Sequence, residues 1–379
     1  MTVQTLPIIR RSHSIVLSFD DQGLLAFDFI RKQNVYITPL GLGLLASINC
    51  WTSSSVLFDW LQPYYPPCCI SAELSRLVDL GLIVVQGSEE GTKDEQYERK
   101  WVWGAIAGHY HFGIKDPYYM NPDETISWLE GQVAATPLVP LYTTNDGIED
   151  VVSLPPPQLE KEIFSTMMAR RSYRGFESSS DKSVTLEQLR DCLFFGLGIT
   201  GFIETPMSEL GHLPLKTTPS AGARNPYEAF VYARNVKGLK KGIYHYSALD
   251  NTLGLIRDGD LPTIGDILAV QPWFDNAAIL IMLVANFERT MWKYPHPTGF
   301  RVVLLEAGHI AQNILLAATA NGLSSAPTCA VSDSLAQNLL DLDPITQALI
   351  YTVAIGATSN VPTQADPASI TANPYLRVD

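Results

Sequence analysis

The stretch FRVVLLEAGHIAQNILLAATAN (residues 300–321) predicts one long helix, which Gly322 ends as a C-cap. Apolar residues lie on nearly every side of this helix, so we expect it to be buried in the core or at a subunit interface. Its polar residues Glu306, His309 and Asn313 share one face. Because buried polar groups need hydrogen-bond partners, this face forms either a polar network in the core or the back of a functional site.

The sequence around this helix predicts a mixed α+β domain, which we place at residues 158–379. Runs of apolar residues predict strands at 228–234, 277–285 and 348–355. A helix is expected at 159–170, and Thr185 is expected to cap another helix that ends near Leu197.

The first part of the chain, residues 1–145, predicts a separate small domain and a linker region. The turn sequence DDQG (20–23) separates two strand-like runs, and a strand, three helices and a final strand follow. The predicted strands are 14–19, 24–30, 35–38 and 82–86, and the predicted helices are 39–48, 53–61 and 71–80. This order is typical of a winged-helix-like module. We expect 87–100 to be an exposed loop and 145–158, with its three consecutive prolines, to be the linker.

Composition limits the classes of partner. The formal net charge is −13 over 379 residues, which disfavours nucleic-acid binding. No stretch reaches the roughly 20 uninterrupted apolar residues of a membrane span, and the N-terminus lacks the apolar core of a signal peptide. We therefore expect a cytoplasmic protein with no membrane partner. The five cysteines include no CxxC pair, so neither a metal site nor a disulfide framework is expected.

The first candidate motif is ARRSYRGF (169–176), in which Arg170, Arg171, Ser172 and Arg174 follow a predicted helix. Guanidinium groups and a hydroxyl bind a phosphomonoester through paired hydrogen bonds, so this cluster is a candidate phosphate site. The alternative is an exposed basic turn, because arginine usually lies at the surface.

The second motif, PSAGARNP (219–226), precedes a predicted strand. Its small residues Ala221 and Gly222 allow the backbone to approach a flat ring closely, and Arg224 and Asn225 supply hydrogen-bond donors. An ordinary loop rich in proline and glycine is the alternative.

The third motif, RTMWKY (289–294), lies in a predicted loop before the long helix. An ammonium group at Lys293 is expected to lower the pKa of the neighbouring Tyr294 phenol, and such a pair can act as a general base or acid. The alternative is a surface loop with one aromatic anchor.

Taken together, the three motifs resemble those of the SagB-type, McbC-like dehydrogenases, a branch of the nitroreductase superfamily. The resemblance covers roughly residues 161–360, and the preceding residues are similar to the small winged-helix-like domain of that family. It implies a nitroreductase-like fold that binds FMN between two copies of the chain in a homodimer. The chain departs from the family at Asn225, where many relatives have histidine.

The resemblance also implies roles for individual residues. Lys293 and Tyr294 match the catalytic pair. The remaining matched positions are Arg170, Arg171, Ser172 and Arg174 for the phosphate and ribityl chain, Ser220, Ala221, Gly222 and Arg224 for the isoalloxazine, and Pro327, Thr328 and Cys329 near its reactive edge. For Cys329, a buried structural cysteine is the alternative.

The family implies oxidation of a thiazoline or oxazoline ring to a thiazole or oxazole during peptide natural-product biosynthesis. We expect a peptide or carrier-bound peptidyl substrate, Tyr294 as the base, FMN as hydride acceptor and dioxygen as the final electron acceptor. Two alternatives stay open. One is an NAD(P)H-dependent nitro or quinone reductase on the same fold, and the other is a non-catalytic protein that binds a peptide or a carrier domain.

Overall fold

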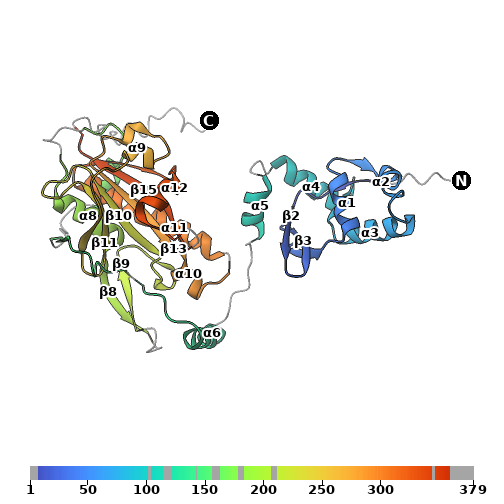
Figure 1. The fold of residues 1–379 in the computed structure, drawn as a ribbon, viewed down its shortest axis with the longest axis horizontal. Helices are drawn as coiled ribbons and strands as arrows, with labels where there is room; N and C mark the ends of the chain where they lie inside the picture. Colours follow the sequence, from blue (N-terminus) through green and yellow to red (C-terminus); the bar gives the residue numbers. More distant parts are fainter. Residues whose placement is uncertain are drawn as a thin grey trace. The chain divides into compact units, whose positions relative to one another are not determined.

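The protein forms two compact units, Met1–Tyr118 and Tyr119–Asp379 (Figure 1). The computed structural model describes residues 7–100, 104–113, 122–141, 143–155, 163–177, 183–205, 211–296, 298–343 and 346–358. Each unit has its own core.

The described residues of the first unit form two small antiparallel sheets and a group of helices. One sheet has the order β5-β1-β6 and the other β2-β3-β4. The elements are β1 (Ile8–Arg11), β2 (Ile15–Asp20), β3 (Gly23–Asp28), β4 (Gln33–Tyr36), α1 (Pro39–Ser47), β5 (Thr52–Ser53), α2 (Ser54–Leu61), α3 (Pro67–Asp79), β6 (Ile83–Val85), α4 (Glu89–Lys100) and α5 (Gly104–Gly113). Apolar side chains of α1, α2 and α3 pack on these strands, for example Leu44, Leu57 and Leu77, all fully buried.

The predicted hairpin, three helices and final strand are confirmed to within a few residues. β1 was not predicted, and it supplies the central strand of its sheet. The order α1-β5-α2-α3-β6 is that of a winged helix, but a helix rather than a wing hairpin follows β6. The winged-helix assignment therefore stays a prediction.

The predicted loop at 87–100 is wrong, because this segment forms the helix α4. Acidic side chains on α4 face basic groups of β1 and of the loops that follow β1 and β3. Asp94 pairs with Arg10 at 2.7 Å and with His13 at 2.9 Å, and Glu90 pairs with Arg31. Partners distant in the sequence stabilise a helix that its own residues did not indicate.

The second unit contains the large sheet of the protein. Within the described residues it has seven antiparallel strands in the order β14-β15-β13-β10-β11-β12-β7. The elements are α6 (Pro122–Ala135), β7 (Val151–Ser153), α7 (Ile163–Ala169), α8 (Leu186–Leu197), β8 (Ile199–Glu204), β9 (His212–Lys216), η3 (Ala221–Ala223), β10 (Tyr227–Ala233), β11 (Gly242–Ser247), β12 (Thr252–Arg257), α9 (Ile264–Ile267), η4 (Pro272–Phe274), β13 (Ile279–Asn286), α10 (Phe287–Lys293), α11 (Thr298–Ala320), β14 (Ser324–Thr328), α12 (Asp333–Leu340) and β15 (Gln347–Gly356).

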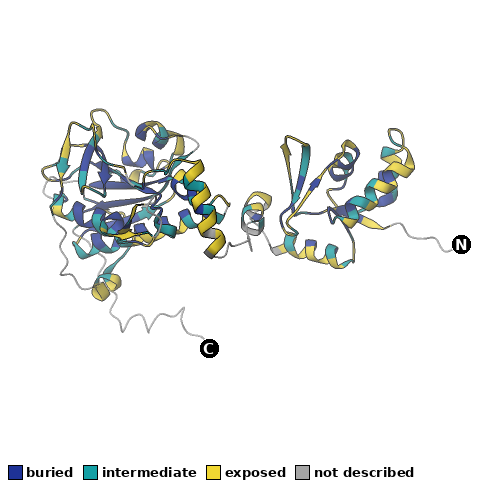
Figure 2. Cartoon of the chain, turned by 90° about the horizontal axis from the view of Figure 1, so that it is seen from below, coloured by how far each residue is buried: buried dark blue, intermediate teal, exposed yellow. Residues whose placement is uncertain are grey.

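Helices cover both faces of this sheet, which explains why its central strands read as continuous apolar runs. On β13, Ile281 and Leu283 belong to the core shared with α8 and α11, whereas Leu280 and Met282 belong to the core shared with α9 and α12. Figure 2 shows the strands of this sheet as mainly buried. The predicted strands correspond to β10, β13 and β15, and β7, β11, β12, β14 and the β8–β9 hairpin were not predicted.

The expected linker at 145–158 lies partly in the second unit. β7 pairs with β12 at the edge of the sheet, and the amide of Asn145 donates to the Thr252 hydroxyl at 2.8 Å. The contacts of these residues place the boundary between the units earlier, after Tyr118.

The long helix is confirmed as α11, but its surface is more varied than the sequence suggests. Its inner face is buried against α8 and the sheet, whereas Phe300 and Leu305 remain 44% and 60% exposed. Among the described residues, α11 is the helix long and apolar enough to span a membrane, and half of its most apolar part is buried in this unit. It is therefore the core helix of the second unit.

Thr185 caps α8 as predicted, and a substitution there has a measurable consequence. Its hydroxyl accepts the Gln188 N–H at 3.3 Å, and the Gln188 side chain accepts the Thr185 N–H at 2.9 Å. We expect Thr185→Ala to lower the free energy of unfolding of the second unit by about 1 kcal/mol in a denaturant titration. Thr185→Ser keeps the hydroxyl and should match the wild type, so equal losses in both variants would contradict the capping role.

Candidate active site

The loop between β9 and β10 has a strained backbone. Gly222, Ala223 and Asn225 adopt φ values of 57°, 53° and 46°. Residues other than glycine rarely occupy this left-handed region, and they persist there only where neighbouring contacts hold them. The second motif of the sequence is therefore a shaped loop rather than an ordinary turn.

The side chains of Lys293 and Tyr294 lie directly against Gly222. A Cβ atom at residue 222 would lie 2.5 Å from the Tyr294 hydroxyl oxygen and 2.8 Å from Lys293 Nζ. A side chain at residue 222 would displace the ends of the Lys293 and Tyr294 side chains, and the φ of 57° is one that glycine adopts without strain. The structure thus brings the second and third motifs into contact, 70 residues apart in the chain.

Glu306 of α11 holds the beginning of the same loop. Its carboxylate accepts hydrogen bonds from the Ser220 hydroxyl and the Ala221 N–H. Burial raises the pKa of Glu306 to about 7, against the opposing effects of Ser220 and Lys216. Of the polar face predicted on this helix, Glu306 therefore backs the candidate site, whereas His309 is exposed.

Arg224 is buried beneath the loop with one donor free. Its Nε donates to the carbonyl of Arg289 at 2.7 Å, and its guanidinium lies 4.7 Å from the centre of the Trp292 ring. Among the described residues, Arg224 Nη2 and Trp292 Nε1 are buried without a hydrogen-bond partner. Burial, with the nearby Arg289, lowers the pKa of Arg224 to about 10. Buried donors of this kind are costly unless a ligand or water accepts from them.

The environment of the Lys293–Tyr294 pair differs from the prediction. Lys293 is the last residue of α10 rather than part of a loop, and Tyr294 is its C-cap. Burial raises the pKa of Tyr294, and the cation that opposes this shift is Arg224. Burial and Arg224 both lower the pKa of Lys293. The expected lowering of the phenol pKa by Lys293 is therefore wrong, because desolvation outweighs charge proximity.

The first motif lies beside β14, as a separate group of candidate residues. Ser172 forms a parallel bridge with Ser325, and the Tyr173 N–H donates to the Ser325 carbonyl at 3.0 Å. Arg170 and Arg171 are half-buried, and Ser172 and Arg174 are exposed. The segment follows α7, as predicted, and its guanidinium groups are accessible to an anion.

Pro327 and Thr328 end the same strand, β14, next to the arginine segment. Cys329 follows them and is exposed, so the alternative of a buried structural cysteine is wrong. Ser325 Oγ is buried and, within the described part of the chain, has no hydrogen-bond partner. The predicted residues thus form two groups, one around Gly222 and one around the start of β14.

Two polar residues near the Gly222 group were missed. Glu228 lies on β10 and His245 on β11, and their side chains meet at 3.0 Å. Each interrupts a run of apolar residues, YEAFVYA and GIYHYS, and a charged residue in a buried strand is the one signal that could have identified them.

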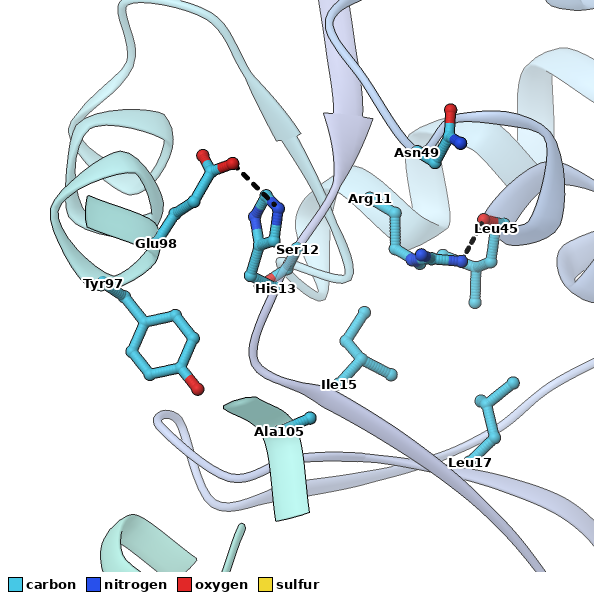
Figure 3. A pocket seen from close by; sticks show the side chains of 10 residues that line it. All are labelled: Arg11, Ser12, His13, Ile15, Leu17, Leu45, Asn49, Tyr97, Glu98 and Ala105. Atoms are coloured by element: carbon cyan, nitrogen blue, oxygen red, sulfur yellow. Dashed lines mark hydrogen bonds and ion pairs between the residues drawn. The ribbon is translucent and has the colours of Figure 1, made fainter. Parts of the chain in front are cut away.

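The first unit has a cavity of its own, of about 420 Å³ (Figure 3). Ile15 and Leu17 of β2 form an apolar wall, and His13 and Glu98 form a polar one. His13 Nε2 lies 3.5 Å from Glu98 Oε1, and Arg11 donates to the Leu45 carbonyl at 3.1 Å. The mixed lining suits an amphipathic ligand, and no residue of the sequence motifs lies in it.

Comparison with known proteins places residues 167–357 in the pattern of the nitroreductase family. The chain is 33% identical over 198 residues to protein MJ1384 of Methanocaldococcus jannaschii, which is named as a nitroreductase. That match covers 51% of this chain and 91% of MJ1384.

Two further relatives are named as processing proteins. The trifolitoxin-processing protein TfxB of Rhizobium leguminosarum bv. trifolii is 31% identical over 35% of this chain and 37% of its own length. The microcin B17-processing protein McbC of Escherichia coli is 30% identical over 34% of this chain and 50% of its own length. The chain therefore spans half or less of these two relatives.

The contact at Gly222 leads to a prediction. Gly222→Ala should lower the free energy of unfolding by about 1–3 kcal/mol, because the added methyl displaces Lys293 and Tyr294. Gly211→Ala is the matched control, since Gly211 has a φ of 61° and a Cβ there would meet no described atom within 4 Å. Equilibrium unfolding in denaturant measures the loss in both variants. Equal losses of stability would contradict the role of the contact at Gly222.

Proposed function

This chain belongs to the nitroreductase family, with relatives in its McbC-like branch, and we propose that it is an FMN-dependent dehydrogenase that oxidises an azoline ring in a peptide. The product is a thiazole or oxazole. The observation that carries this proposal is the contact of Gly222 with Lys293 and Tyr294, which places two proton-handling groups beside a bare stretch of backbone.

The residues present fit FMN. The buried Arg224 Nη2 has no acceptor among the described residues, which leaves a donor for an oxygen atom of the cofactor. At the other group, Arg170, Arg171 and Arg174 supply positive charge for a terminal phosphate. When bound, FMN would accept a hydride from the ring carbon, and dioxygen would then take the two electrons.

Lys293 and Tyr294 would act together when a proton leaves the neighbouring ring carbon, one as the base and the other as a hydrogen-bond donor. The lowered pKa of Lys293 favours the neutral amine, which is the form that accepts a proton. The raised pKa of Tyr294 keeps its hydroxyl protonated, so that it can donate a hydrogen bond to the substrate. We therefore assign the base to Lys293 and the hydrogen-bond donor to Tyr294, the reverse of the roles predicted from the sequence.

The names of TfxB and McbC support a peptide substrate, because each is named for the processing of a natural product. We propose a peptide or carrier-bound peptidyl chain as the substrate. The cavity of the first unit is a candidate contact for part of that chain.

We also propose a homodimer. Apolar side chains remain on the surface of α7 and α11, among them Phe164 at 80% and Leu305 at 60% exposure. Two copies that cover these helices would remove this surface from water. Each copy would then contribute to the FMN site of the other, as the resemblance implies.

The similarity to MJ1384, which extends over 91% of that protein, favours a second candidate function. An NAD(P)H-dependent reductase of nitroarenes or quinones would use the same fold. Steady NADPH consumption with a nitroarene, without any change in a peptide, would support this candidate instead.

The first test concerns the cofactor and the reaction together. The purified protein should be yellow, release FMN rather than FAD on denaturation, and convert a thiazoline-containing peptide with the loss of two hydrogens, measured by mass spectrometry. The reason for FMN is the arginine group, which suits a terminal phosphate. The GxGxxG sequence at residues 196–201 lies at the end of α8 and in β8, and a dinucleotide-binding turn would instead follow a strand and open a helix. Release of FAD, or a protein that binds no flavin after reconstitution, would exclude the proposal.

The second test separates the roles of the pair. Lys293→Arg keeps the positive charge but cannot accept a proton, so kcat should fall roughly 100-fold or more with FMN still bound. Tyr294→Phe keeps the ring and removes the hydroxyl, and its kcat should fall by roughly 10- to 100-fold.

The dependence of kcat on pH shows which of the two residues acts as the base. A base must lose its proton before it acts, so kcat of the wild type should rise with pH until Lys293 is neutral. Because burial lowers the pKa of Lys293, this rise should come at a lower pH than for an exposed lysine. It should be absent in Lys293→Arg and retained in Tyr294→Phe. A rising limb that survives in Lys293→Arg would remove the base from Lys293.

A further inference from the structure

A series of buried polar side chains crosses the second unit behind the candidate site. Asn145, His245, Glu228 and Arg289 follow one another in hydrogen-bonding contact, and all but Glu228 are at most 6% exposed. Their elements are otherwise apolar, and none of the three motifs predicted this series. A hydrogen-bonded polar series of this kind rigidifies the core around it. Among the described residues, Arg289 Nε is its one buried nitrogen without a partner.

Both ring nitrogens of His245 have hydrogen-bond partners in the series. Asn145 donates from Nδ2 to the Thr252 carbonyl and hydroxyl, so its Oδ1 faces His245 Nδ1 at 2.8 Å. The other ring nitrogen, Nε2, faces Glu228 Oε2 at 3.0 Å. Both ring nitrogens thus have oxygen partners, which fix the orientation of the ring.

Glu228 contacts both His245 and Arg289. Its Oε2 binds His245, and its Oε1 binds Arg289 Nη2 at 2.5 Å. Burial alone would raise its pKa, but His245, Arg289 and Lys216 hold the pKa of Glu228 down to about 2. Glu228 is therefore a carboxylate at neutral pH.

Arg289 connects the series to the strained loop between β9 and β10. Its Nη1 donates to the Asn225 carbonyl at 3.0 Å, and its own carbonyl accepts from Arg224 Nε at 2.7 Å. Asn225 is one of the residues with positive φ, so Arg289 binds the backbone where it is strained. One end of the Glu228 series thus contacts Arg224 and Asn225, two and three positions after Gly222.

We propose that Glu228 and His245 are positioning residues of the candidate active site, which act through Arg289 to hold the loop of Gly222 against Lys293 and Tyr294. This inference rests on the proposed function for its catalytic consequence. Its structural consequence, the rigidity of the loop, does not depend on the reaction.

The position of Glu228 and His245 favours variants that fold. Both side chains line a cavity of about 440 Å³ on the α12 side of the sheet, together with Thr143, Phe230 and Asn286. Water in that cavity can satisfy a polar replacement. Glu228→Gln keeps the size of the side chain and removes its charge, and His245→Gln leaves the Glu228–Arg289 ion pair in place.

The experiment uses the full chain with three measurements. These are kcat and KM with FMN bound, the FMN dissociation constant, and amide hydrogen exchange of peptides that cover residues 219–226 in the flavin-free protein. The matched control is Glu288→Gln, since Glu288 is an exposed glutamate next to Arg289 in the sequence.

Glu228→Gln should lower kcat by roughly 10- to 100-fold with KM nearly unchanged, because a displaced loop misplaces the groups that react. It should speed exchange in residues 219–226 by roughly 10-fold, weaken FMN binding, and leave exchange in the rest of the sheet unaltered. His245→Gln should show smaller changes of the same kind, and Glu288→Gln none.

The proposal is overturned if the variants lower only the melting temperature, with loop exchange and kcat per bound FMN unchanged. It is also overturned if exchange increases equally throughout the sheet. Should Glu228→Gln not fold, His245→Gln decides alone. If the wild type oxidises no azoline, the proposed function fails, and loop exchange with FMN affinity still tests the role of Glu228 and His245.

Discussion

The absence of a side chain at residue 222 is the constraint on which the candidate site depends. Lys293 and Tyr294 approach the backbone of Gly222 so closely that a single methyl group would displace them. This approach requires the loop to be held from two sides, by Glu306 at Ser220 and Ala221, and by Arg289 at Asn225. Glu306 lies on α11 and Arg289 on α10, which directly follows β13, so the fold acts on the site through the backbone of one short loop.

That design places charged groups in a sheet whose core is otherwise apolar. Taking an ion out of water costs several kcal/mol, and hydrogen bonds and ion pairs must offset this desolvation cost. For Glu228 the partners are His245 and Arg289, and for Arg289 they are a carboxylate, a carbonyl and a hydroxyl. Removing one partner would leave the others buried with an uncompensated charge, which costs more than the pair contributes. The series therefore fixes a unique geometry more than it adds to stability.

The sequence predicts what depends on local pattern. The helix of α11, the Thr185 cap and the nitroreductase-like fold follow from periodicity, capping residues and the three motifs. It misses what depends on distant partners. α4 becomes a helix because Arg10 and Arg31 lie opposite its acidic residues, and β7 joins the sheet because β12 offers a free edge. Likewise the pKa of Tyr294 follows from its burial, which two adjacent letters of sequence do not reveal.

Electrostatics around the loop accounts for the kind of ligand that the site suits. Lys216, Arg224, Arg289 and Lys293 bring four basic groups to this region, and Glu228 and Glu306 bring two acidic ones, in a chain with a net charge of −13. The lowered pKa values of Lys216, Arg224 and Lys293 show that positive charge is disfavoured there, chiefly through desolvation. A ligand that carries or develops negative charge reverses this penalty, because it supplies the missing counter-charge at short range. An electron acceptor that becomes negative on reduction gains most from such surroundings when it is reduced. In the proposed reaction, the same positive charge would favour the neutral amine of Lys293, so one arrangement of charges would favour both the removal of a proton and the acceptance of electrons.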